Sequence, residues 1–209
     1  MAQVMPSAQS KWDRIYEARI ASSNLTIFKI EANPALVNAV RLLPRTGHAL
    51  DLAAGLGGDS CFLALRGLTV DALDISTVAM TWVNNQAQRA KLPIHARAIN
   101  IQSETLKANQ YDVVHFHHFL DRSLCKAITQ SLRPGGILIA STFLTPEHLA
   151  NESPKDLPGP SNPNFRLNAG ELPALFPSLQ VIQFIETEAD PNLDQGVAPY
   201  HGMIIGKKP

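Results

Sequence analysis

Short apolar runs alternate with helical stretches through the middle of this 209-residue chain. The runs are rich in aliphatic and β-branched residues, as buried strands are, and they lie at 48–53, 68–75, 93–99, 111–119 and 136–143. Helices are expected between them, at 58–65, 77–90 and 122–132. This alternation predicts an α/β fold in which a mostly parallel sheet carries helices on both faces.

The two ends of the chain depart from this pattern. Before the first strand, helices are expected at 11–21 and 34–43, and Pro34 suits the first position of the second helix. Near the C-terminus, 179–188 and 200–208 are expected to form two strands close in sequence. A hairpin connection would make these two strands antiparallel.

Prolines gather after the fifth strand, since seven of the 15 lie between Pro146 and Pro177. Regular structure is not expected at 151–164, and a short helix is expected at 169–176. Long loops in compact domains are uncommon and often functional, and the alternative is a variable surface insertion. We expect one domain made of a helical cap, a cofactor-binding core, a proline-rich loop and two final strands, at 1–45, 46–143, 144–178 and 179–209.

Charges balance along the chain, with 18 basic and 18 acidic residues. A neutral chain has no global field that attracts nucleic acid. No apolar run reaches the ~18 residues of a membrane span, and the N-terminus lacks the apolar centre of a signal peptide. Cys61 and Cys125 have no zinc-binding spacing and are expected to be reduced, buried thiols. We expect a cytoplasmic monomer or homodimer that binds a small molecule and neither nucleic acid nor a membrane.

A glycine-rich segment follows the first strand and reads Asp51-Leu52-Ala53-Ala54-Gly55-Leu56-Gly57-Gly58-Asp59-Ser60. Glycines there let the backbone approach a ligand, and the N-terminus of the next helix points at the same place. Asp51 lies inside the strand, where a carboxylate needs a partner. Asp74 ends the second strand, 19 residues after Gly55, where a carboxylate can accept both ribose hydroxyls.

Two cofactors fit this layout: a nicotinamide dinucleotide and S-adenosylmethionine. The dinucleotide fingerprint requires a third glycine where this chain has Ser60. A pyrophosphate gains little from acids at Asp51 and Asp59, whereas S-adenosylmethionine carries a cationic amine and a sulfonium that acids stabilise. The residues therefore favour S-adenosylmethionine, and a tight turn that binds nothing is the third interpretation.

Four segments resemble the motifs of class I S-adenosylmethionine-dependent methyltransferases, namely HALDLAAGLGGDS, VDALDIS, YDVVHFHHFL and LRPGGILIAST. The resemblance implies a Rossmann-like sheet of seven strands in the order 3-2-1-4-5-7-6, with strand 7 antiparallel. Three further segments resemble the small tellurite-resistance-type and thiopurine-methyltransferase-like members. They are Trp12-Asp13 with Tyr16, ASTFLTPE after the fifth strand, and PGPSNPNFRLNAGEL at 158–172.

The resemblance also implies a set of cofactor-binding residues. Asp74 would hold the ribose, and Asn100 stands where an aspartate often contacts the adenine amino group, from which an amide oxygen can also accept. The full expected set is Asp51, Ala53, Gly55, Gly57, Asp59, Asp74, Ile75, Asn100, Ile101 and His115. The fourth motif has no Asn-Pro-Pro-Tyr-like sequence, which argues against methylation of amino nitrogens in nucleobases or glutamine.

Methyl transfer is an in-line displacement at the sulfonium carbon, which requires positioning and exclusion of water and needs no metal. A base is required only when the nucleophile is protonated. His117 and His118 follow the fourth strand and are the candidate catalytic bases; packing in the core is the alternative. No metal site is expected, because His148 and His201 are distant in sequence.

Five further residues are candidates for contact with the substrate. Arg122 and Arg166 suit an anionic acceptor, and Phe165 precedes Arg166. Trp12 and Tyr16 either cover the cofactor or fix the N-terminal helix. The predicted function is methyl transfer from S-adenosylmethionine to a small-molecule or oxyanion acceptor. The alternatives are an NAD(P)-dependent oxidoreductase and a non-catalytic S-adenosylmethionine-binding protein.

Overall fold

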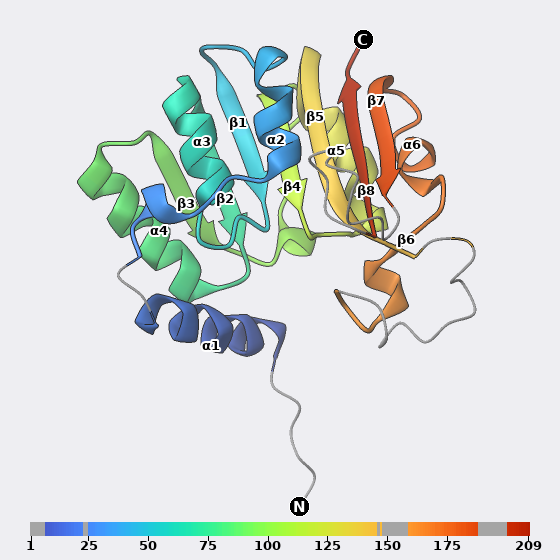
Figure 1. Ribbon diagram of the computed structural model, residues 1–209. Helices are drawn as coiled ribbons and strands as arrows, with labels where there is room; N and C mark the ends of the chain where they lie inside the picture. The colour runs from blue at the N-terminus through green and yellow to red at the C-terminus, as the bar shows by residue number, and fades with distance from the viewer. Residues whose placement is uncertain (1–6, 23–24, 146, 148–158, 188–199) are drawn as a thin grey trace, which may run out of the picture. The chain divides into compact units, whose positions relative to one another are not determined.

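The computed structural model describes residues 7–22, 25–145, 147, 159–187 and 200–209 (Figure 1). The chain divides into two compact units. The first unit contains residues 1–32 and 44–105, and the second contains residues 33–43 and 106–209.

The sheet has the strand order β3-β2-β1-β4-β5-β8-β7, with the short strand β6 pairing with β5 off this path. Strand β8 is antiparallel to both β5 and β7, whereas the other pairs described are parallel. The predicted numbering did not count β6, so the predicted strands 6 and 7 are β7 and β8 here. The observed order is then the predicted order 3-2-1-4-5-7-6, and the predicted antiparallel strand 7 is β8. The predicted α/β fold is therefore confirmed.

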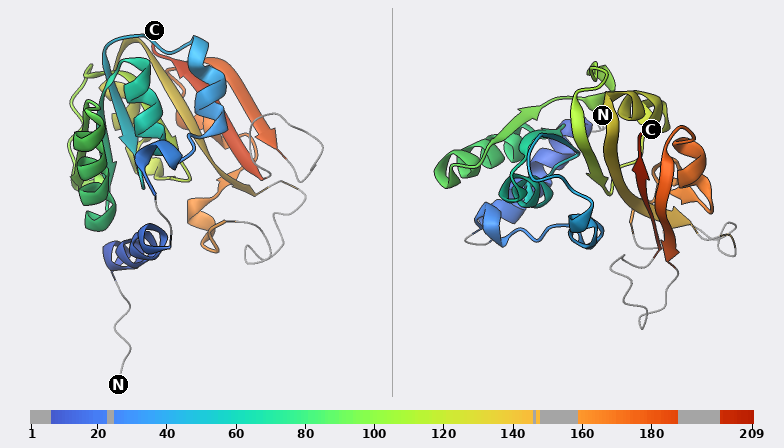
Figure 2. Two further views of the ribbon diagram at one scale, coloured as in Figure 1. Left: turned by 60° about the vertical axis from the view of Figure 1, so that its left-hand side comes forward. Right: turned by 90° about the horizontal axis from the view of Figure 1, so that it is seen from above.

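The first unit alternates strands and helices around three parallel strands (Figures 1 and 2). Helix α4 packs along β2 and β3, α3 packs against β1 and β2, and α1 lies on α4. Leu50, Leu52, Val70, Ala72 and Leu73 have no exposed surface and form the centre of its apolar core. The elements are α1 (Ala8–Ala21), η1 (Ile27–Lys29), β1 (His48–Leu52), α3 (Gly58–Arg66), β2 (Thr69–Asp74), α4 (Thr77–Ala90), β3 (Ile94–Ala98) and η3 (Ile101–Ser103).

The second unit carries the remaining strands, which surround the long central strand β5. Its elements are α2 (Pro34–Asn38), η2 (Ala39–Arg41), β4 (Tyr111–His117), η4 (Arg122–Leu124), α5 (Cys125–Ser131), β5 (Leu132–Thr145), η7 (Pro163–Phe165), β6 (Leu167–Asn168), α6 (Glu171–Leu175), β7 (Gln180–Thr187) and β8 (His201–Lys207).

Three details differ from the sequence-based expectation. The helix expected at 122–132 begins as a 3-10 turn and becomes α-helical only at Cys125, because Asp121 caps the turn through Ser123. The helix expected at 34–43 is α-helical for five residues and then tightens into a 3-10 turn. The part of 151–164 that the structure describes includes the start of a 3-10 turn at Pro163.

Two other expectations concern the thiols and the membrane. Cys61 and Cys125 are both free and buried, as predicted. Among the described residues, no helix is long and apolar enough to cross a bilayer.

Candidate functional site

The glycine-rich loop joins β1 to α3 in the first unit and holds a left-handed backbone at three positions. Ala53, Gly55 and Gly57 have φ values of 56°, 53° and 74°. Gly57 is the N-cap of α3 and provides no side-chain cap. A Cβ atom added at Gly58 would lie 2.7 Å from the carbonyl oxygen of Glu31. The loop therefore needs small residues, and the first turn of α3 has no side-chain cap at Gly57.

Asp74, at the end of β2, is bonded to the glycine loop. Its Oδ2 accepts the backbone N–H of Gly55 at 2.9 Å, and its Oδ1 accepts the backbone N–H of Ser76 at 2.9 Å. The side chain is buried, with 4% of its surface exposed. Burial raises the pKa of Asp74, while the backbone N–H groups act in the opposite direction. A carboxylate offers about four acceptor positions, so Asp74 keeps capacity for a ligand hydroxyl.

Asp51 has the partner that its position in the strand requires. It is 1% exposed, and its Oδ2 accepts the hydroxyl of Ser60 at 2.5 Å. Ser60 stands where a dinucleotide-binding loop has its third glycine. The departure from the dinucleotide fingerprint thus has a structural role, since the hydroxyl fixes the carboxylate beneath the loop.

Helix α1 attaches to the same loop through Tyr16. A Cβ atom at Gly55 would lie 3.0 Å from the Tyr16 hydroxyl. Burial raises the pKa of Tyr16, and the charge of Asp74 adds to this effect. Trp12 stacks on Tyr16 with ring centroids 5.8 Å apart and is itself 42% exposed. The two aromatic residues proposed as substrate contacts therefore lie in the first unit, with Tyr16 against the glycine loop.

Asp13 fixes the other side of α1. Its Oδ1 accepts the hydroxyl of Ser76 at 2.6 Å and the backbone N–H of Val78 at 3.1 Å. The Ser76 hydroxyl also accepts the N–H of Ala79, as an N-cap residue does. Asp13 therefore attaches helix α1 to the turn between β2 and α4. Ser76, which lies in this turn, is two positions after Asp74, the predicted ribose-binding acid.

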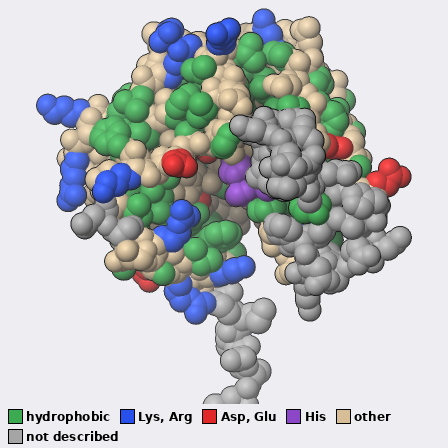
Figure 3. Space-filling model, in the orientation of Figure 1, with side chains coloured by type: hydrophobic (Ala, Val, Ile, Leu, Met, Phe, Trp, Pro, Cys, Tyr) green, Lys and Arg blue, Asp and Glu red, His purple; other side chains and the backbone are tan. Residues whose placement is uncertain are grey.

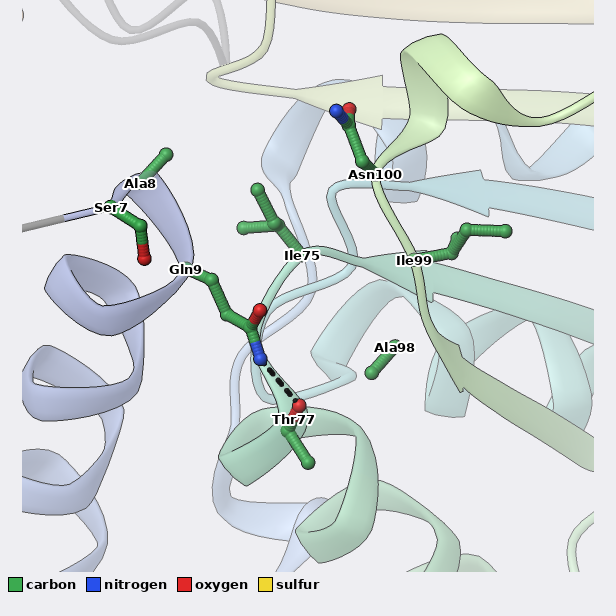
Figure 4. A pocket seen from close by; sticks show the side chains of 8 residues that line it. All are labelled: Ser7, Ala8, Gln9, Ile75, Thr77, Ala98, Ile99 and Asn100. Atoms are coloured by element: carbon green, nitrogen blue, oxygen red, sulfur yellow. Dashed lines mark hydrogen bonds between the residues drawn. The ribbon is translucent and has the colours of Figure 1, made fainter.

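A pocket of about 400 Å³ opens beside this turn (Figure 4). Asn100 and Ile75 line it from the ends of neighbouring strands, and Gln9 of α1 faces them, with its amide donating to the Thr77 hydroxyl at 2.8 Å. Its lining residues are Ser7, Ala8, Gln9, Ile75, Thr77, Ala98, Ile99 and Asn100. The structure thus brings Ile75 and Asn100, two of the predicted cofactor-binding residues, to one pocket.

Histidine side chains gather in the second unit, and Figure 3 shows histidines in one patch on the face in view. His115 is fully buried in β4, and its Nδ1–H donates to the carbonyl oxygen of Ile139 at 3.0 Å. His117 places its Nδ1 2.8 Å from the Ser141 hydroxyl. The Nε2 atom of His118 lies 2.8 Å from that of His201, across 83 positions in sequence. Sequence reasoning set His201 aside because of that distance; His148 lies outside the described residues.

Arg122 is held by Glu171 in a two-pronged ion pair. Its Nε donates to Oε1 at 2.5 Å and its Nη2 to Oε2 at 2.8 Å. Its guanidinium also donates to the backbone carbonyls of Asn164 and Arg166. The hydrogen bond with Glu171 raises the pKa of Arg122 and lowers that of Glu171. This guanidinium therefore fixes the segment that ends the proline-rich region.

The other two candidate substrate residues behave differently from each other. Arg166 is only 2% exposed and donates to the Thr145 hydroxyl and the Leu144 carbonyl at the end of β5. Phe165 is 52% exposed. Arg166 thus supports the strand end, whereas the Phe165 ring is open to a ligand.

Sequence reasoning did not select Asp13, Ser60, Glu171 or His201. The sequence does point to two of these residues. Asp13 lies in the Trp12-Asp13 segment that resembles the tellurite-resistance-type members, and Ser60 replaces the third glycine of the dinucleotide fingerprint. Glu171 lies 49 positions from Arg122. No local pattern points to that pair or to His201.

Solved structures share this fold at low sequence identity. TehB from Haemophilus influenzae superposes with a TM-score of 0.68 at 17% identity, covering 95% of this chain and 67% of the other. A putative S-adenosylmethionine-dependent methyltransferase from Listeria monocytogenes gives 0.62 at 16%, covering 84% and 97%. Geranyl diphosphate C-methyltransferase from Streptomyces coelicolor, solved with Mg²⁺, geranyl diphosphate and S-adenosyl-L-homocysteine, gives 0.65 at 12%, covering 100% and 89%.

Comparison with the sequence models of families identifies a family even though these pairwise identities are low. No curated protein matches the chain. The sequence model of a family described as tellurite resistance protein TehB matches residues 24–190, which is most of the chain. Together with the methyltransferase folds above, this confirms the predicted resemblance to class I S-adenosylmethionine-dependent methyltransferases and supports S-adenosylmethionine as the cofactor. The chain belongs to the TehB family.

Proposed function

We propose that the protein transfers a methyl group from S-adenosylmethionine to a small-molecule or oxyanion acceptor. The observation that carries this proposal is Asp74, a buried carboxylate bonded to the N–H of Gly55 beside the pocket that Ile75 and Asn100 line. An acid that is held against a glycine loop at the end of the second strand is the arrangement that recognises a ribose.

The cofactor would extend from the glycine loop into this pocket. Asp74 would accept the ribose hydroxyls, and the Asn100 amide oxygen would accept from the adenine amino group, with Ile75 and Ile101 against the ring. The backbone of Ala53, Gly55 and Gly57 would pass beside the methionine part. Asp51 and Asp59 would add negative potential that favours its ammonium and sulfonium groups. His115 belongs to the predicted cofactor-binding set as well.

The reaction itself requires little acid–base catalysis. The departing thioether is neutral, so the protein must hold donor and acceptor about 3–3.5 Å apart in line and exclude water. An oxyanion acceptor needs no base, whereas a protonated oxygen, nitrogen or sulfur nucleophile does. His117 and His118 are the residues that we propose for that role, with Phe165, Trp12 and Tyr16 shaping the acceptor and donor sites.

Two features support a small or anionic acceptor. The chain has 18 basic and 18 acidic residues and no net charge, so it has no overall positive field that would attract nucleic acid. The TehB family is described by resistance to tellurite, a chalcogen oxyanion. Arg122 is paired with Glu171 and also bonds to the backbone of Asn164 and Arg166. We therefore propose that Arg122 supports this segment of the chain and does not contact the acceptor, and we propose the same supporting role for Arg166.

Calorimetric titration of the full chain with S-adenosylmethionine and with S-adenosylhomocysteine tests the proposal. We expect saturable binding of both, followed by methyl transfer from radiolabelled cofactor to at least one member of an acceptor panel that includes tellurite, selenite, thiols and phenols. Binding of NADH with no binding of either adenosyl compound at millimolar concentration would instead support the oxidoreductase. Binding without transfer to any acceptor would leave a non-catalytic cofactor-binding protein.

A further inference from the structure

Three histidines that are far apart in sequence meet at the carboxyl end of β4. His117 ends β4, His118 follows it, and His201 begins β8. One nitrogen from each ring lies within 4.8 Å of a nitrogen from each of the other two. The rings of His117 and His118 have centroids 3.5 Å apart, and the Nε2 atoms of His118 and His201 are 2.8 Å apart.

The register of strands β4, β5 and β8 brings the three histidines together. Along β4 and β5 His117 is paired with Ser141, and along β5 and β8 Phe143 is paired with His201. The three strands therefore bring the rings to one end of the sheet on a rigid backbone. His118 adopts a left-handed conformation with φ of 55°, which costs energy for a non-glycine residue. Such a conformation persists only where the surrounding structure holds it.

The chemistry of the three rings suits a metal ion. Nitrogen atoms 2.8 Å apart must share a proton or a cation, because two bare lone pairs repel each other. A tetrahedral zinc ion with Zn–N bonds of 2.0–2.1 Å separates its ligand atoms by ~3.3 Å. This separation lies between the 2.8 Å contact and the 4.8 Å limit of the cluster, so the three rings would turn from their present positions to surround one ion.

The surroundings also resemble those of a metal site. The Ser141 hydroxyl bonds to the Nδ1 of His117, which orients the ring as the hydrogen-bond partners of metal-ligating histidines do. Phe143 stacks on His118 with centroids 4.4 Å apart and lies 4.6 Å from the ring of His201. An aromatic wall on one side lowers the access of water to the cluster.

We propose that His117, His118 and His201 bind one divalent transition-metal ion of the class that imidazole prefers, such as Zn²⁺, Co²⁺ or Ni²⁺. Three protein ligands leave a fourth position open for water or an anionic molecule, as in catalytic zinc sites. Metal binding itself is independent of the proposed methyl transfer. Binding of an anionic acceptor at the fourth position rests on the proposed methyl transfer. A histidine that binds metal through its lone pair is not available as a base, so the two proposed roles exclude each other for His117 and for His118.

Titration of the chelator-treated full chain, without a polyhistidine tag, tests the site. Calorimetry with Zn²⁺ should give one ion per chain, and Co²⁺ should give the intense visible absorption of a tetrahedral site. His118→Ala and His117→Ala should each weaken Zn²⁺ binding by at least ~100-fold, and Ser141→Ala should weaken it by ~10–100-fold. His95→Ala removes an exposed histidine of β3 and should leave the affinity unchanged. Circular dichroism and thermal melting confirm that each variant is folded.

Several results would overturn the proposal. They are the lack of saturable one-to-one binding of Zn²⁺ in the folded wild-type chain, and binding that folded His117→Ala and His118→Ala variants retain. The affinity for S-adenosylmethionine is measured in the same samples. It distinguishes a chain that lacks the proposed metal site from a chain that lacks the proposed methyltransferase function. A chain that binds the cofactor and no metal keeps His118 as a base, and a chain that binds metal and no cofactor refutes methyl transfer alone.

Discussion

Replacing Asp74 with asparagine isolates the charge of the acid at the end of β2. The side chain keeps its shape and one acceptor oxygen, but its second group becomes an NH₂ donor. In the wild-type chain both carboxylate oxygens accept a backbone N–H, from Gly55 and from Ser76, each at 2.9 Å. Asparagine therefore faces one of these donors with another donor, at a position where only 4% of the side chain is exposed.

The expected magnitudes follow from this geometry. Loss of one charge-assisted hydrogen bond to the ribose costs about 1.5–3 kcal/mol, which is a rise in Kd of roughly 10- to 150-fold. The buried donor that loses its acceptor lowers the free energy of unfolding by about 1–3 kcal/mol. The loop geometry and the ligand site are thus weakened by the same change.

Calorimetric titration with S-adenosylhomocysteine measures the first effect, and urea denaturation measures the second. Asp71→Asn is the matched control, because it makes the same substitution three positions earlier in β2 and should leave Kd unchanged. Burial raises the pKa of Asp74 above its ordinary 3.8, so cofactor affinity of the wild-type chain should fall on acidification at a pH above that value. A folded Asp74→Asn variant whose Kd stays within twofold of wild type would refute the assignment of Asp74 to the ribose.

Three further predictions concern stability. Gly58→Ala should lower the free energy of unfolding in urea by about 1–3 kcal/mol, because its Cβ would lie 2.7 Å from a backbone carbonyl oxygen; an unchanged midpoint would contradict that contact. Ser60→Ala removes the hydroxyl that bonds to Asp51 at 2.5 Å and should lower the free energy of unfolding by about 1.5–3 kcal/mol; an unchanged urea midpoint would argue against this bond. Glu171 has a pKa below its usual 4.5 because of its hydrogen bond with Arg122, so the pair stabilises the fold above that pH and its contribution is lost as pH falls through the lowered pKa. Glu171→Gln should flatten the fall in melting temperature between about pH 5 and pH 3, and an equally steep fall in the variant would argue against the pair.

The features that the sequence predicted correctly are those encoded locally. The apolar runs of β1 to β5 and the glycines between β1 and α3 are contiguous in the chain, and their spacing has few structural solutions. The start of the helix expected at 77–90 is also encoded locally, because N-capping depends on the next three residues, and the Ser76 hydroxyl accepts the N–H of Ala79.

The features that the sequence did not predict depend on contacts between distant segments. His201 meets His118 only because β8 runs antiparallel to β5 in a particular register, and a shift of one residue would turn its ring to the other face. Arg122 finds Glu171 through the folding of the segment between β5 and β7, which contains no repeated pattern. The helix expected at 122–132 was too long at its start because the Asp121 side chain favours a tight turn there.

Ser76 connects the end of β2 to the N-terminal helix α1 within the first unit. Its N–H donates to Asp74, while its hydroxyl donates to Asp13 of α1. If Asp74 holds the ribose as proposed, binding of the cofactor and attachment of the N-terminal helix share one residue, and we expect their equilibria to be thermodynamically linked. A ligand that tightens the bonds around Asp74 should slow hydrogen exchange in α1, and a partner that pulls α1 away should release the cofactor by the same factor. Hydrogen exchange in α1 would therefore report on binding at a site that the helix adjoins.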